Sequence, residues 1–101
     1  MPLTSKQRAF LRKKAHPIDP ILRIGKEGIG SNTRSSILDA IDSRELIKVK
    51  IMQNCEMKKE DVVTAISQWK EIEIVGMIGK TIILYKENKD DPVFSLEMKS
   101  I

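Results

Sequence analysis

The fold of this chain is decided by residues 21–28, Ile21-Leu22-Arg23-Ile24-Gly25-Lys26-Glu27-Gly28, where an apolar run ends in two glycines that are separated by two residues. Glycine lacks a Cβ and adopts positive φ at little cost, so this pair predicts a sharp turn after a short strand over residues 21–24. A helix is expected to begin just beyond it, with Ser31 or Asn32 as its N-cap. Such a GxxG turn can bring bare backbone, a helix dipole and a lysine against a phosphate.

Positive charge is concentrated in the first half of the chain, which indicates the kind of partner that the protein can bind. Residues 1–50 hold 11 Lys and Arg against 5 Asp and Glu, a balance of +6, whereas residues 51–101 hold 7 against 9, a balance of −2. A basic half indicates a polyanionic partner, and nucleic acid more often than an anionic membrane. Ordinary solvated surface charge explains the same numbers, and charge alone does not separate RNA from DNA.

Length and composition exclude several classes of protein. A chain of 101 residues suits one domain, which at this length buries about two-thirds of its unfolded surface. The single cysteine, Cys55, and the single histidine, His16, provide neither an internal disulfide nor a zinc set. No apolar run is long enough to cross a membrane, and basic residues interrupt any signal-peptide core. We therefore expect a cytoplasmic protein with no metal, cofactor or membrane anchor.

The first helix is expected to be basic. Thr4 and Gln7 have the spacing of a capping box, and the helix should end before His16-Pro17 because a residue that precedes proline avoids helical geometry. Its exposed sides carry Lys6, Arg8, Arg12 and Lys13. For His16, a capping or packing role is favoured over an acid–base role, since no catalytic pattern points to it.

The second helix carries an apolar stripe and one basic residue near its start. Ile37, Leu38 and Ile41 recur at helical spacing, and Arg34 falls in the first turn. We expect Arg34 to hold the same phosphate strand as Lys26.

The clearest strand covers residues 46–52, Leu-Ile-Lys-Val-Lys-Ile-Met. Alternation sends Ile47, Val49 and Ile51 to a buried face and places the lysines on the other face, which is predicted to be wet and positive. Lys48 and Lys50 then either contact the nucleic acid or protect a sheet edge from aggregation.

A third helix is predicted after residues 57–61, with Val62, Val63, Ile66 and Trp69 on one side. Trp69 completes this apolar stripe, so it is expected to cover the core rather than stack on bases. Two strands follow, over residues 72–78 and 81–86. The second GxxG, residues 76–79, joins these strands in a hairpin, and Lys80 at its tip is expected to contribute to binding.

The tail, residues 87–101, is polar as far as Pro92. Phe94, Leu96 and Met98 then alternate, which predicts a short edge strand.

Several strings in this order resemble the CRM (chloroplast RNA splicing and ribosome maturation) domain family, and most closely its free-standing bacterial YhbY-like members. The resemblance covers residues 2–86. It is carried by residues 3–11 (LTSKQRAFL), 15–17 (AHP), 24–28 (IGKEG), 45–50 (ELIKVK) and 78–85 (IGKTIILY).

This resemblance implies an RNA-binding module over residues 1–86. Its fold would be a compact α/β domain in the order αβαβαββ, with three helices and a four-stranded mixed sheet, similar to the C-terminal domain of bacterial translation initiation factor 3. It further implies a role in maturation of the large (50S) ribosomal subunit. The family's GxxG loop falls on Gly25, Lys26, Glu27 and Gly28, where Glu27 is less favourable for phosphate than a basic or neutral residue.

The leading hypothesis is therefore sequence-tolerant binding of structured ribosomal RNA by a monomer, without catalysis or a small-molecule substrate. The expected contacts come from the GxxG loop and from Arg34, Lys48, Lys50, Lys80, Arg8, Arg12 and Lys13. Only four aromatic residues exist, so stacking should be minor, with Tyr85 the one strand aromatic available for it. The alternative is a protein-interaction module on pre-ribosomal particles. No arrangement of catalytic residues or Walker-type loop indicates an enzyme.

Overall fold

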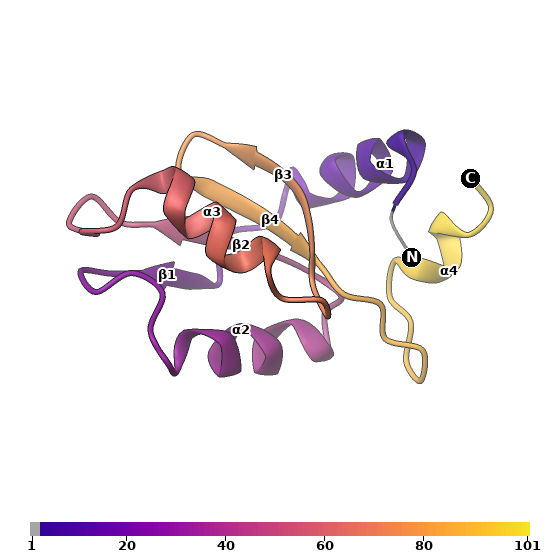
Figure 1. The fold of residues 1–101 in the computed structure, drawn as a ribbon. Coiled ribbons are helices and arrows are strands. Elements are labelled where there is room, and N and C mark those ends of the chain that lie inside the picture. The colour runs from indigo at the N-terminus through magenta and orange to yellow at the C-terminus, as the bar shows by residue number, and fades with distance from the viewer. Residues whose placement is uncertain (1–2) are drawn as a thin grey trace.

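The computed structural model describes residues 3–101, in which a four-stranded mixed sheet is covered by helices on both faces (Figure 1). The elements in chain order are α1 (Ser5–Ala15), β1 (Leu22–Ile24), α2 (Thr33–Asp42), β2 (Leu46–Ile51), α3 (Lys59–Ser67), β3 (Glu73–Ile78), β4 (Thr81–Tyr85) and α4 (Ser95–Met98). The predicted order αβαβαββ is confirmed, and α4 is an additional short helix in the tail.

The strand order β1-β2-β4-β3 brings three connections to one end of the sheet. β1 pairs in parallel with β2, with Ile24 opposite Ile51, and the other two pairings are antiparallel. Parallel strands need a crossover connection, which α2 supplies. The end of β1, the end of β2 and the β3–β4 turn therefore lie together.

Two hydrophobic cores sandwich the sheet. Ile37 and Ile41 of α2 and Val62 and Ile66 of α3 pack on one face, and Trp69 covers part of this core as predicted. The second core lies on the opposite face and contains buried residues of α1, the sheet and the tail: Leu11, Ala15, Leu46, Val75, Ile83, Tyr85 and Met98.

The caps of the first two helices differ. The predicted capping box of α1 is present, since the Thr4 hydroxyl accepts from Gln7 N and the Gln7 side chain accepts from Thr4 N. Asn32 is the N-cap residue of α2, but its side chain makes no capping hydrogen bond.

The prediction of a wet, positive face on β2 is wrong for Lys48. The strand alternates as expected, but α1 lies across the lysine face and leaves Lys48 only 9% exposed. Its Nζ donates to the carbonyl of His16 at the C-terminus of α1, 3.3 Å away. A cation at this position also interacts favourably with the negative end of the helix dipole, so Lys48 stabilises α1.

The predicted edge strand in the tail is also wrong, because the tail folds back and forms α4. The fully buried carboxylate of Glu45 holds it there by accepting hydrogen bonds from the backbone N–H groups of Asn88, Val93, Phe94 and Ser95 and from the Ser95 hydroxyl, at 2.6–3.0 Å. Glu45 has φ of 64°, an uncommon conformation for a residue other than glycine, Asn or Asp. The alternation in the sequence could not reveal this partner, which lies about 50 residues earlier in the chain.

Replacing this carboxylate should destabilise the tail. Burial alone would raise the pKa of Glu45, but the hydrogen bonds from Asn88, Ser95 and Phe94 outweigh it and hold the pKa below its ordinary value of 4.5. We expect Glu45→Gln to lower the free energy of unfolding at pH 7 by about 1–3 kcal/mol, because an NH2 group replaces one of the two accepting oxygens and leaves the donors that face it without an acceptor. Denaturant unfolding measures this loss.

The pH dependence follows from the lowered pKa. The stabilisation by Glu45 is fully present above pH 4.5 and is lost as the pH falls through the lower folded-state pKa, so the difference between wild type and variant should shrink in acid. Glu97→Gln is the matched control, since Glu97 lies in the same tail, exposed and ion-paired with Lys14. Equal stability of Glu45→Gln and wild type at pH 7 would contradict this role.

Candidate nucleic-acid interface

Three loops at one end of the sheet are fastened together by backbone hydrogen bonds. Glu56 N donates to Lys26 O at 2.9 Å, which joins the β2–α3 loop to the GxxG turn. Ile51 N donates to Lys80 O at 2.8 Å, which joins the end of β2 to the β3–β4 turn. Figure 1 shows the β1–α2 and β2–α3 loops projecting beyond the sheet on the same side.

The two glycines of the turn have different structural roles. Gly28 N donates to Gly25 O at 3.0 Å and closes the turn. Gly28 has φ of 71°, and a Cβ there would lie 2.3 Å from the sulfur of Met57, so the fold itself requires glycine. A Cβ on Gly25 would meet nothing within 4 Å. Packing within the protein therefore does not require glycine at this position, and the exposed backbone of Gly25 leaves room for a ligand.

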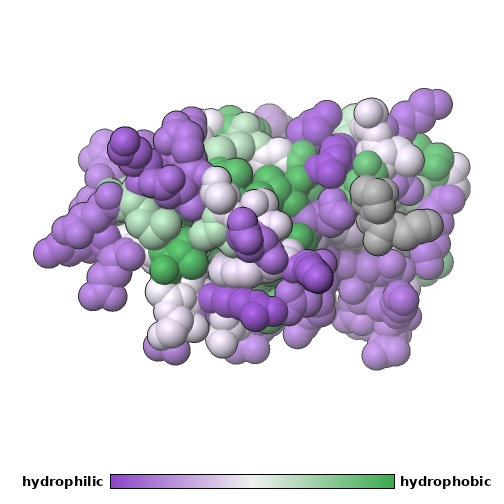
Figure 2. Space-filling view, in the orientation of Figure 1, coloured by the Kyte–Doolittle hydropathy of each residue, from purple (hydrophilic) through white to green (hydrophobic). Residues whose placement is uncertain are grey.

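The cations around this turn form what we call the basic end. Its members come from the three loops and the adjoining strand and helix ends: Arg23, Lys26, Lys50, Lys58, Lys59 and Lys80. All six are exposed, and none takes part in the five ion pairs found among residues 3–101. Lys59 donates to the carbonyl of Gly79. Figure 2 shows hydrophilic side chains projecting at this end, on the left of the view.

Acidic residues also lie among the loops of the basic end, and Glu60 and Asp61 stand in the first turn of α3 beside Lys58 and Lys59. Glu27 and Glu56 are exposed in the same loops and reduce the local positive potential. Glu27 makes no ion pair with Arg23, although the two residues are close in sequence. In contrast, the acidic partners in all five ion pairs of residues 3–101 lie outside the three loops: Asp42, Glu71, Glu73, Glu87 and Glu97.

The structure brings together only part of the predicted set. Gly25, Lys26, Glu27, Gly28, Lys50 and Lys80 lie at the basic end. Lys13 is exposed on α1, outside the loops that form this end.

The other predicted cations have structural partners. Arg8 donates to the carbonyl of Ile74 and pairs with Glu73, and Arg12 donates to the carbonyl of Val75. These arginines therefore hold α1 against β3. Arg34 lies in the first turn of α2 as predicted, but it pairs with Glu71 beyond α3.

Three cations of the basic end were missed from the sequence. Arg23 stands opposite Lys50 in the parallel β1–β2 pairing, and only that register places them side by side. Lys58 and Lys59 begin α3, which starts at the same end of the sheet. The motif Lys58-Lys59 was visible in the sequence, but nothing local indicated that it lies beside the turn.

The aromatic side chains lie away from the basic end. Tyr85 is only 5% exposed within the second core, so its predicted availability for stacking is wrong, and burial raises the pKa of its hydroxyl to about 12. Phe10 and Phe94 pack against the same core, and Trp69 packs on the other face. A contact with nucleic acid at the basic end therefore involves no aromatic stacking.

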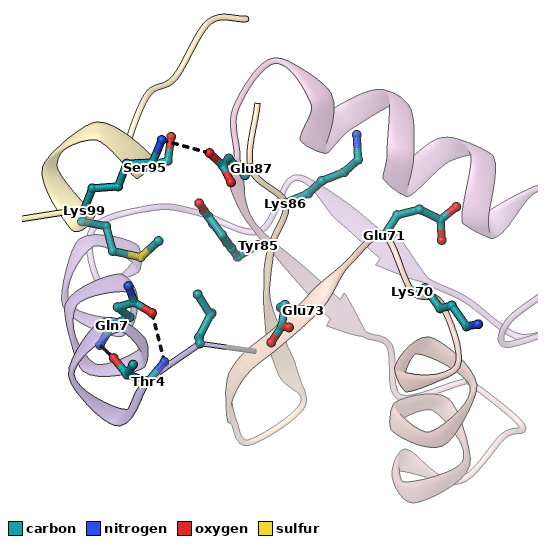
Figure 3. Close-up of a pocket in the computed structure, with 12 residues that line it drawn as sticks. Thr4, Gln7, Lys70, Glu71, Glu73, Tyr85, Lys86, Glu87, Ser95 and Lys99 are labelled. Carbon is teal, nitrogen blue, oxygen red and sulfur yellow. Dashed lines mark hydrogen bonds and ion pairs between the residues drawn. The ribbon is translucent and has the colours of Figure 1, made fainter. Parts of the chain in front are cut away.

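A cavity of about 700 Å³ lies at the opposite end of the sheet, between α1, the tail and the ends of β3 and β4 (Figure 3). In Figure 3, Tyr85 lies near Ser95 and Glu87, while Lys86 and Glu71 point away on the far side. Its charged lining residues are three lysines and three glutamates, so it lacks the consistent positive charge that a nucleic acid requires.

Neither a membrane span nor a metal cluster is found in the described part of the chain. The helices within residues 3–101 are too short or too polar to cross a bilayer. Among the same residues, no three His, Cys, Asp or Glu side chains are grouped as metal ligands.

Comparison with known proteins identifies relatives along nearly the whole chain. The chain is 46% identical to the Bacillus subtilis protein named "Probable RNA-binding protein YqeI" over 94 residues, covering 93% of this chain and 98% of the relative. It is 30% identical to a Haemophilus influenzae protein named "RNA-binding protein", covering 87% and 89%. A solution structure from Staphylococcus aureus, described as a candidate RNA-binding protein, matches with a TM-score of 0.72 and 43% identity, covering 87% of this chain and 92% of that one.

The model of the CRS1/YhbY (CRM) domain family matches residues 3–86, which include α1, the GxxG turn and all four strands. The resemblance seen in the sequence is thereby confirmed, and the chain belongs to the CRS1/YhbY (CRM) domain family.

Proposed function

We propose that this protein is a cytoplasmic, monomeric RNA-binding protein that binds ribosomal RNA during assembly of the large ribosomal subunit. Residues 1–86 form the RNA-binding unit and residues 87–101 a tail. The observation that carries the proposal is the open backbone at Gly25 within a ring of exposed cations without ion-pair partners. The relatives named as RNA-binding proteins support RNA as the ligand.

The physical basis of binding is electrostatic. A cation that is not held in an ion pair is free to contact a phosphate, and binding releases counterions from the nucleic acid. Lys26 in the turn, Lys50 near the end of β2 and Lys80 in the β3–β4 turn come from three separate segments that meet at this end of the sheet, so one sugar-phosphate strand can contact several of them. These contacts read backbone rather than base sequence, which suits sequence-tolerant binding.

The proposal includes no chemical step. Cys55 donates to the carbonyl of Met57, and His16 is an exposed residue at the end of α1, so neither belongs to a nucleophile–base pair.

The two glycines should respond differently to substitution. Gly25→Val should leave the fold intact and weaken binding of a ribosomal RNA fragment by about tenfold, because the side chain occupies the space above the turn. Gly28→Ala should instead lower the free energy of unfolding by about 1–2 kcal/mol, because the backbone at residue 28 is left-handed and the added Cβ would clash with Met57. Fluorescence anisotropy and denaturant unfolding measure the two effects. Unchanged RNA affinity for a folded Gly25→Val protein would refute the turn as the contact.

Lys50 and Lys48 form a matched pair on one strand and one face. Lys50→Met should weaken RNA binding and reduce the slope of log affinity against log salt by about 0.7, the contribution of one single-strand phosphate. Lys48→Met should leave that slope unchanged and lower the free energy of unfolding by about 1 kcal/mol, because Lys48 is buried against α1. Equal salt slopes for wild type and Lys50→Met would count against the basic end as the RNA contact.

A competition experiment with duplex DNA tests whether the protein prefers RNA to DNA.

A second candidate function is protein binding on pre-ribosomal particles. Three apolar side chains of the tail, Val93, Leu96 and Ile101, are 50%, 66% and 49% exposed. They are therefore available to a protein partner. Leu96→Ser should then reduce association with pre-ribosomal particles without changing affinity for naked RNA, which sedimentation and anisotropy distinguish. If both are unchanged, the tail has no such role.

A further inference from the structure

We propose that the cleft between β1 and α2 receives one unpaired nucleobase of the RNA strand that lies on the Gly25–Gly28 turn, an inference that rests on the proposed function. The cleft has a volume of about 220 Å³. It is lined by residues of the first two strands and of the start of α2: Leu22, Arg23, Ile24, Asn32, Thr33, Ser36, Ile37 and Val49.

The position of the cleft connects it to the turn. Ile24 in its wall directly precedes Gly25, and Asn32 on its rim follows the loop that leaves Gly28. The cleft thus lies between the two ends of the connection that contains the turn. A strand whose sugar-phosphate backbone rests at Gly25 has a base beside this cleft.

The lining suits the two kinds of surface that a base presents. Ile24, Ile37 and Val49 are buried and give an apolar floor for the flat face of the ring. Asn32 and Ser36 stand exposed on the rim, and their side chains make no hydrogen bond with the described residues, so they are available to the polar edge of a base. Thr33 is already engaged, since its hydroxyl accepts from Gly30 N at 2.8 Å.

The free edge of the sheet adds further polar groups. β1 is an outer strand, and the carbonyl of Ile24 faces β2, where it accepts from Met52 N at 2.9 Å. Because backbone groups alternate along a strand, the N–H and C=O of Arg23 face the open edge beside the cleft.

The size of the cleft favours a single base over a larger ligand. Sites for small molecules and cofactors usually have volumes of about 300–1,000 Å³, and this cleft is smaller. The four aromatic side chains lie in or against the two cores, so a base that leaves the RNA stack beside the turn finds no ring to stack on. The cleft is a concave surface next to the turn that can hold such a base.

Ser36 and Ser35 provide a matched test, because both are exposed in α2 and only Ser36 lines the cleft. Ser36→Leu should fill the cleft and weaken binding of a short oligouridine RNA by about tenfold, comparable to the loss of one stacked base. Ser35→Leu should bind as wild type does. If both folded variants bind as wild type does, the proposal is overturned.

A measurement on the unaltered protein does not depend on these variants. NMR spectra are recorded with oligouridine and with an abasic ribose-phosphate strand of the same length. The Lys26 amide should shift with both strands, whereas the Asn32 side-chain amide should shift only with the strand that carries bases. Equal shifts of Asn32 with both strands would overturn the cleft as a base site and leave the proposed function intact. No shift of Lys26 with either strand would overturn RNA binding at the turn itself.

Discussion

The parallel pairing of β1 with β2 is the constraint on which the candidate site depends. With Ile24 opposite Ile51, the chain leaves both strands at the same end of the sheet, so the GxxG turn and the β2–α3 loop emerge side by side. Met57 of the second loop then packs on Gly28 of the first, and the β3–β4 turn joins them through Lys80. Cations that are far apart in the sequence become neighbours only because of this register.

The basic residues divide into two groups with different physical roles. Arg8, Arg12 and Lys48 donate to backbone carbonyls and fix α1 on the sheet. The cations of the basic end have no acidic partner among residues 3–101 and remain available to an external anion. Net charge does not reveal this division, because a lysine that satisfies a helix end and a lysine that faces solvent contribute equally to it.

The order of the elements from α1 to β4 was predictable from the sequence, since periodicity and turn signals mark them. The prediction of an edge strand in the tail was wrong because the carboxylate of Glu45, about 50 residues earlier in the chain, accepts hydrogen bonds from the backbone of the tail. The structure places Lys50 and Lys80 at the same end of the sheet as the turn, and their role in binding stays a prediction. The partners of Arg8, Arg12 and Arg34 could not be found from the sequence, because each partner lies more than 35 residues away. Local pattern indicates which face a side chain occupies and not what covers that face.

The central claim is that ribosomal RNA lies against the basic end, and ultraviolet crosslinking of the protein in growing cells tests it most directly. The crosslinked peptides are identified by mass spectrometry and the attached RNA by sequencing. The account predicts crosslinks within residues 23–30, 50–59 and 79–81, attached to RNA of the large ribosomal subunit. Crosslinks confined to residues 87–101, or attached mainly to other RNA, would contradict it.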